Sequence, residues 1–95
     1  RLNMITAVKI LERKNLGDYS HRECELSATI DEGDDPNAVI TATVAKASWY
    51  VQLPELESKY RKAKADLESE DAEVVARAKA NIVRFEARKK YVESL

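Results

Sequence analysis

The chain has 95 residues, of which 44% are hydrophobic and 35% charged, and its formal net charge is -1. This length predicts one domain, 1–95, and two glycines and two prolines are too few for an all-β fold with many tight turns. The near-neutral charge excludes a strong polyanion binder that acts through bulk charge. A single cysteine excludes an internal disulfide and favours a cytoplasmic location, and the sequence has no run of 18 apolar residues to predict a membrane span.

Two β-strands are predicted at the start of the chain, over 4–12 and 21–30. The first is rich in β-branched residues, with Thr6, Val8 and Ile10 at a spacing of two. The second alternates strictly, which indicates a sheet with one buried face made of four apolar residues: Cys24, Leu26, Ala28 and Ile30. Asn, Gly and Asp in the loop at 15–20 tolerate the positive φ angles of turns. We therefore expect an antiparallel hairpin over 4–30, with a bulge because its loop is longer than two residues.

A helix is predicted to begin after the acidic segment 31–35. Asp35 followed by Pro36 is a specific start signal, because Asp caps helix N-termini and Pro favours the first helical position. The residues that follow, 37–52, contain β-branched side chains typical of strands and also apolar residues at helical spacing. We favour a helix, since the start signal is more specific than strand propensity. Leu53 and Pro54 then predict a boundary, because the residue before Pro avoids helical geometry.

The last forty residues carry two further helical patterns. The first places apolar residues on one stripe: Leu53, Leu56, Tyr60, Ala63 and Leu67. The second predicts a helix over about 70–94 with Ser69 as its N-cap. One continuous helix over 54–94 is the alternative to a helical hairpin, because no Gly or Pro separates the two patterns. The predicted fold is thus α+β, a two-stranded antiparallel β-hairpin packed on two or three α-helices in the helical part 35–95.

The sequence offers little support for catalysis or metal binding. His21 and Cys24 are three positions apart, so on a strand they point to opposite faces and cannot hold one ion. The acidic loop at 31–35 lacks the spacing of a calcium loop, and two glycines cannot supply a phosphate-binding or nucleotide-binding glycine pattern. We therefore expect no enzyme, no metal and no cofactor.

Two groups of basic and aromatic residues are candidate ligand contacts. One lies around the predicted hairpin turn: Arg13, Lys14, Tyr19, His21 and Arg22. The other includes Lys62 and Lys64, which a tight turn near 68–70 would bring beside Arg77 and Lys79. Both groups fit nucleic-acid or nucleotide binding, although a charged helix face stabilised by i,i+4 pairs, such as Glu55 with Lys59, is the favoured explanation of the second. Trp49 is either a core residue or an anchor for a partner.

The last helix carries two apolar stripes, which favours contacts on two sides. One stripe contains Val75, Ala78, Ile82, Phe85 and Val92, and the other contains Ala76, Ala80, Val83, Ala87 and Tyr91. If the rest of the chain covers the first, the second fits another subunit, with Val83, Ala87 and Tyr91 at the interface. The prediction is a small, non-enzymatic binding protein that forms a dimer or a higher homo-oligomer. The alternative is that the 53–67 helix and the hairpin cover both stripes within one chain.

The first part of the chain also resembles a group of known proteins. The turn Asn15-Leu16-Gly17-Asp18-Tyr19, the alternating strand after it and the step Glu32-Gly33-Asp34-Asp35-Pro36 resemble those of a group of small phage and archaeal proteins of mostly undefined function. About a third of the chain carries the resemblance. It implies a phage-like origin, with action in the host cytoplasm. Some small phage proteins built from a hairpin and helices act in counter-defence, by blocking a host protein or by sequestering a nucleotide signal, but the resemblance assigns no binding residues for either role.

Overall fold

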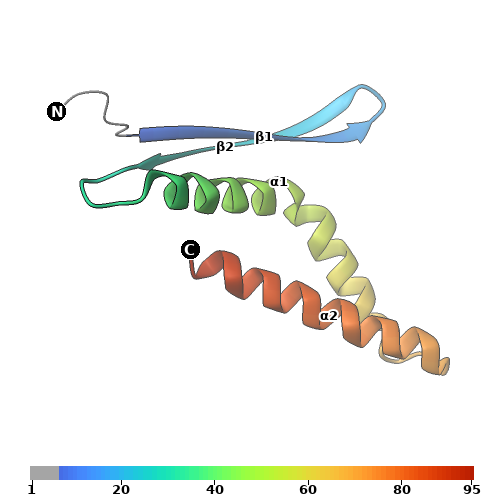
Figure 1. Ribbon diagram of the computed structural model, residues 1–95. Coiled ribbons are helices and arrows are strands. Elements are labelled where there is room, and N and C mark those ends of the chain that lie inside the picture. The colour runs from blue at the N-terminus through green and yellow to red at the C-terminus, as the bar shows by residue number, and fades with distance from the viewer. Residues whose placement is uncertain (1–6) are drawn as a thin grey trace. The chain divides into compact units, whose positions relative to one another are not determined.

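The computed structural model describes residues 7–95. The elements follow in the order β1 (Ala7–Gly17), β2 (Ser20–Thr29), α1 (Pro36–Asp66) and α2 (Ala72–Glu93), as Figure 1 shows. The predicted α+β class, with one antiparallel hairpin and two helices, is confirmed; residues 4–6 of the predicted first strand lie outside the described residues. The chain forms two compact units, Arg1–Gln52 and Leu53–Leu95, and α1 contributes to both.

The hairpin has the two different faces that its alternation predicts. Strand β1 pairs with β2 so that Val8 lies opposite Ala28 and Ile10 lies opposite Leu26. The residues on this face are half-buried, and the residues between them are exposed. The even-numbered face of β2, which ends in the buried residue Ile30, is therefore the inner face, as predicted.

The hairpin turn is tighter than expected. Both strands extend into the predicted loop at 15–20, and only Asp18 and Tyr19 connect Gly17 to Ser20. Asp18 and Tyr19 have φ angles of 49° and 64°, which fit a type I′ turn, whose twist matches that of the strands. The predicted bulge is present as a register shift between Asn15 and Gly17. The irregularity therefore lies within the paired strands, and the loop that connects them is short.

The ambiguous segment 37–52 is helical. Its start is the predicted one: the Asp35 side chain accepts a hydrogen bond from the Asn37 amide at 3.0 Å, and Pro36 is the first helical residue. The expected boundary at Leu53 and Pro54 is wrong, since α1 continues through Pro54 to Asp66. Proline removes one N–H donor from a helix without always ending it. Here it lies two residues past the end of the first unit.

The first unit has a small core between the hairpin and the start of α1. Thr43, Ala47 and Val51 recur every four residues along the helix and are buried, together with Ile30 at the end of the hairpin. The Thr43 hydroxyl is satisfied inside the helix, where it donates to the Val39 carbonyl at 2.7 Å. The period of four thus aligns one stripe of α1 with the inner face of the hairpin.

The second unit is a helical hairpin, which decides against one continuous helix over 54–94. Its core includes Ala63 of α1 and Ala78 of α2, both buried, and the rings of Tyr60 and Phe85 stack with centroids 4.4 Å apart. The N-cap of α2 is Asp71 rather than the predicted Ser69, because the Asp71 carboxylate accepts a hydrogen bond from the Glu73 amide at 2.9 Å. Ser69 belongs to the turn before it and accepts from the Asp71 amide.

Candidate functional site

The five candidate residues of the hairpin do not lie on one surface. Arg13 and His21 are on the exposed face, whereas Lys14 and Arg22 lie opposite each other on the half-buried face. Tyr19 is at the turn, between the two faces. The period of two along each strand causes this division, because adjacent residues point to opposite sides. The same rule keeps His21 and Cys24 on different faces, so the two side chains share no ion.

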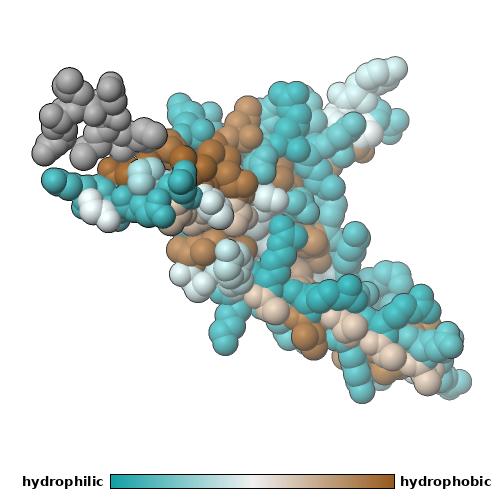
Figure 2. All heavy atoms as spheres, viewed as in Figure 1, coloured by the Kyte–Doolittle hydropathy of each residue, from teal (hydrophilic) through white to brown (hydrophobic). Residues whose placement is uncertain are grey.

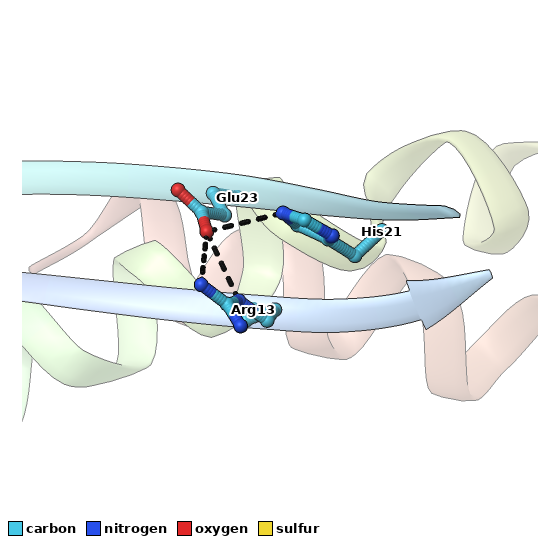
Figure 3. A network of polar contacts seen from close by, with 3 residues as sticks. All are labelled: Arg13, His21 and Glu23. Carbon is cyan, nitrogen blue, oxygen red and sulfur yellow. Dashed lines mark hydrogen bonds and ion pairs between the residues drawn. The ribbon is translucent and has the colours of Figure 1, made fainter. Parts of the chain in front are cut away.

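The exposed face carries a three-residue polar network, drawn in Figure 3. The Glu23 carboxylate accepts hydrogen bonds from Arg13 at 3.0 Å to Nε and 2.5 Å to Nη2, and His21 Nε2 lies 3.3 Å from the same oxygen. Arg13 and Glu23 are direct cross-strand neighbours. Because the side chains are exposed, the network adds little stability. It does occupy Arg13, which reduces its availability for a phosphate.

The hairpin tip presents an aromatic ring to solvent. Tyr19 is fully exposed, and neighbouring Leu16 is 42% exposed. The φ angle of Tyr19, 64°, lies in the left-handed region, which costs a bulky L-residue about 1–2 kcal/mol. Stability alone would favour glycine at this position. An exposed, strained aromatic residue therefore points to a contact made by its ring.

The two inward-facing cations serve different purposes. Arg22 stabilises the first unit, because its Nη1 donates to the Val51 carbonyl of α1 at 2.9 Å. Lys14 makes no hydrogen bond or ion pair within residues 7–95, and it lines an open hollow of about 310 Å³ together with Arg13, Ser48 and Gln52. These groups suit a small anion, but Glu12 lines the same hollow and opposes one.

The helical cations are also divided. Lys62 lines a second open hollow, of about 370 Å³, together with Arg77 and Asn81 of α2. Its ammonium pairs with Asp66 at 3.1 Å, and the Asn81 side-chain oxygen accepts from Arg84. Lys64 instead lies 5.3 Å from the centre of the Tyr60 ring. The helical hairpin thus joins Lys62 to Arg77, as a tight turn predicts, and leaves Lys64 apart from them. Asn81, four residues after Arg77, was not among the predicted residues.

One face of α2 carries exposed apolar side chains. Every residue of the second stripe is exposed: Ala76, Ala80, Val83, Ala87 and Tyr91, with Val83 at 64% and Tyr91 at 55%. At 100° per residue these five positions lie on the side of α2 opposite Ala78, Ile82 and Phe85, which are buried or half-buried. Figure 2 shows beige and brown side chains between hydrophilic ones along α2. We call this surface the outer face of α2.

Acidic and basic side chains are partly separated along the segment 65–90. Residues 65–76, which form the end of α1, the turn and the first part of α2, contain five acidic residues and no basic one. Residues 84–90 contain four basic residues and one acidic residue. The charges of the two segments largely cancel in the net charge of the chain, so the total of -1 conceals the separation. The sequence already contained this signal, since five of the eight residues from Asp66 to Glu73 are acidic.

Other candidate features add no site. Trp49 is 4% exposed, which places it inside the structure rather than on a binding surface. Residues 7–95 hold no group of three or more His, Cys, Asp or Glu side chains that could bind a metal ion. Within the same residues, neither helix is long and apolar enough to cross a membrane.

Comparisons with known proteins give no further assignment. No protein family model, curated protein or solved structure matches the chain. The functional argument therefore rests on the surfaces described above.

Proposed function

We propose that the chain is a non-enzymatic interaction module that associates with itself through the outer face of α2. The observation that carries this proposal is the exposure of Val83 and Tyr91 on a helix whose opposite side already packs in the core. A helix needs only one apolar face to pack within its own chain. A second apolar face on the same helix is typical of a protein–protein contact.

The composition of the outer face supports a helix as its partner. Ala76, Ala80 and Ala87 have small side chains, which let a second helix approach closely, and Val83 and Tyr91 supply larger contacts. Closed two-fold dimers are the commonest homo-oligomers, so the expected species is a dimer. One helix face is smaller than a standard interface of about 800 Å² per partner, so the dimer should be weak and concentration-dependent.

Light scattering coupled to gel filtration tests this proposal over loading concentrations from about 1 μM to about 1 mM. The expected mass rises from one chain to two. Val83→Glu should weaken association by about tenfold or more, because it places a carboxylate in the apolar contact. Val44→Glu is the matched control, since Val44 is an exposed valine on α1, and it should leave the dimer unchanged.

Two results would contradict the proposal. One is a mass of a single chain over the whole concentration range. The other is loss of helical circular dichroism in Val83→Glu, which would place Val83 in the core of the chain.

A second function, nucleic-acid or nucleotide binding, is favoured by a separate observation. Tyr19 is fully exposed in a strained turn, as a base-stacking residue would be, and Lys62, Arg77 and Asn81 line one hollow. The resemblance of the hairpin to small phage and archaeal proteins adds a host protein or a nucleotide signal to the candidate targets. The outer face of α2 remains the stronger candidate, because ion pairs already engage Arg13 and Lys62.

Binding to a fluorescent single-stranded oligonucleotide tests this second function. The slope of log affinity against log salt should be about -0.7 per neutralised phosphate. The double variant Lys62→Gln/Arg77→Gln should flatten the slope, whereas Lys64→Gln, which removes a cation outside the hollow, should change it less. Absence of binding at low salt would contradict the function.

A further inference from the structure

We propose that α2 pairs with α2 of a second copy in antiparallel orientation, about a two-fold axis that passes between Ala80 and Val83. This inference rests on the proposed self-association and adds the direction and register of the helix pair. Its evidence is the order of the charges along α2, with Glu73 in the first turn and basic residues at 88–90, which is independent of the apolar character of the outer face.

The order of these charges favours the antiparallel direction. In the register given below, residues 73–79 of one copy lie beside residues 84–90 of the other, so Glu73 faces Lys90 on both sides of the axis. The helix dipoles also oppose each other in this arrangement. A parallel pair would bring Glu73 beside Glu73 at one end and the basic residues 88–90 of the two copies together at the other. A second copy in antiparallel orientation is therefore the partner of complementary charge.

The spacing of the outer face defines the register. Ala76, Ala80, Val83 and Ala87 alternate in steps of four, three and four residues, which is the a/d spacing of a two-helix contact. Antiparallel packing that places Ala80 opposite Val83 of the second copy also places Ala76 opposite Ala87. Extending this register by one step brings Glu73 opposite Lys90 of the second copy, so an ion pair closes each end.

The two flanks of this contact are not equivalent. On one flank Lys79 lies near Glu86 of the second copy, which is favourable. On the other flank Arg77 approaches Arg84 of the second copy, which is unfavourable. The attractive contacts, Glu73 with Lys90 and Lys79 with Glu86, each occur twice in the dimer. The repulsive contact between Arg77 and Arg84 also occurs twice. The balance favours this register but predicts modest affinity, in agreement with the small apolar area.

Cysteine cross-linking tests the direction directly in the full chain. Ala76→Cys and Ala87→Cys are made separately, each with Cys24→Ala so that no other thiol is present. In the antiparallel register residue 76 lies about 16 Å along the axis from residue 76 of the second copy, too far for a disulfide. Each variant alone should therefore stay uncrosslinked under mild oxidation, and their mixture should form a disulfide-linked dimer.

The outcomes separate this inference from the proposed function. A two-chain mass in light scattering with cross-links in each variant alone would leave self-association intact and overturn the antiparallel direction. A one-chain mass at all concentrations would overturn both proposals.

Charge exchange gives a second, independent readout. Glu73→Lys and Lys90→Glu should each weaken the antiparallel dimer by about tenfold, since each turns two attractions into repulsions. The double variant Glu73→Lys/Lys90→Glu should restore the affinity, with helical circular dichroism as the control for folding. A parallel pair would place each of these residues opposite itself, so single variants without effect would overturn the antiparallel register.

Discussion

The two faces of the hairpin can be tested with one substitution at two leucines. Leu26 lies on the inner face opposite Ile10 and is half-buried, whereas Leu11 lies on the outer face and is 52% exposed. Asparagine is chosen at both positions because it is polar but adds no charge beside Glu25, the cross-strand neighbour of Leu11. Full burial of a leucine contributes about 1.5–3 kcal/mol, so the half-buried Leu26 contributes about 1 kcal/mol. A partly buried amide adds a further cost of about 1 kcal/mol.

Leu26→Asn should therefore lower the free energy of unfolding by about 2 kcal/mol, and Leu11→Asn by about 0.5 kcal/mol. In a chain of this size each kcal/mol corresponds to about 4–8 °C in Tm, so the two variants should differ clearly. Thermal unfolding followed by the fluorescence of Trp49, the single tryptophan and a residue of the first unit, measures the difference. Equal losses at both leucines, or a larger loss at Leu11, would refute the assignment of the inner face.

Three further outcomes follow from individual contacts, each measured by thermal unfolding. Tyr19→Gly should be more stable than Tyr19→Ala by roughly 0.5–1 kcal/mol, because only glycine relieves the positive φ; equal stability would contradict the strain. Asp71→Ala should cost about 1 kcal/mol through loss of the α2 N-cap, while Ser69→Ala should cost less, and the reverse order would restore Ser69 as the cap. Arg22→Met should cost about 1 kcal/mol, since it keeps the apolar stem but removes the donor to the Val51 carbonyl; an unchanged Tm would contradict that contact.

The elements that could be predicted from sequence are those fixed by local chemistry. The alternation from Cys24 to Ile30 identified the inner face, and Asp35 with Pro36 identified the start of α1. Both signals act within a few residues, through side-chain direction or a capping hydrogen bond. The segment 37–52 was harder, because its β-branched residues favour a strand locally. Burial of its stripe against the hairpin outweighs that preference.

The predictions that were wrong relied on local sequence signals that the surrounding structure outweighs. Pro54 removes one hydrogen bond from the helix, but the helical residues on both sides of it are enough for α1 to continue. At the turn, Asn15 and Gly17 favour a loop, yet the ladder continues to Gly17 because a bulge absorbs the irregular register. The division of Arg13 from Lys14 followed from the strand period, once β1 was known to extend that far.

The hairpin is the other surface through which two copies could associate, and its charges disfavour this. A two-stranded sheet has two open edges, each of which can pair with a further strand. On the exposed face of the hairpin, β1 carries a row with Lys9 and Arg13, and β2 carries a row with Glu23 and Glu25. Two-fold pairing of β1 edges brings the cationic rows together, and pairing of β2 edges brings the acidic rows together. Joining β1 to β2 is attractive but leaves an open edge on each side, so it does not close into a dimer. The outer face of α2 is therefore the surface on which the proposed two-fold dimer would meet complementary charge, through Glu73 and Lys90.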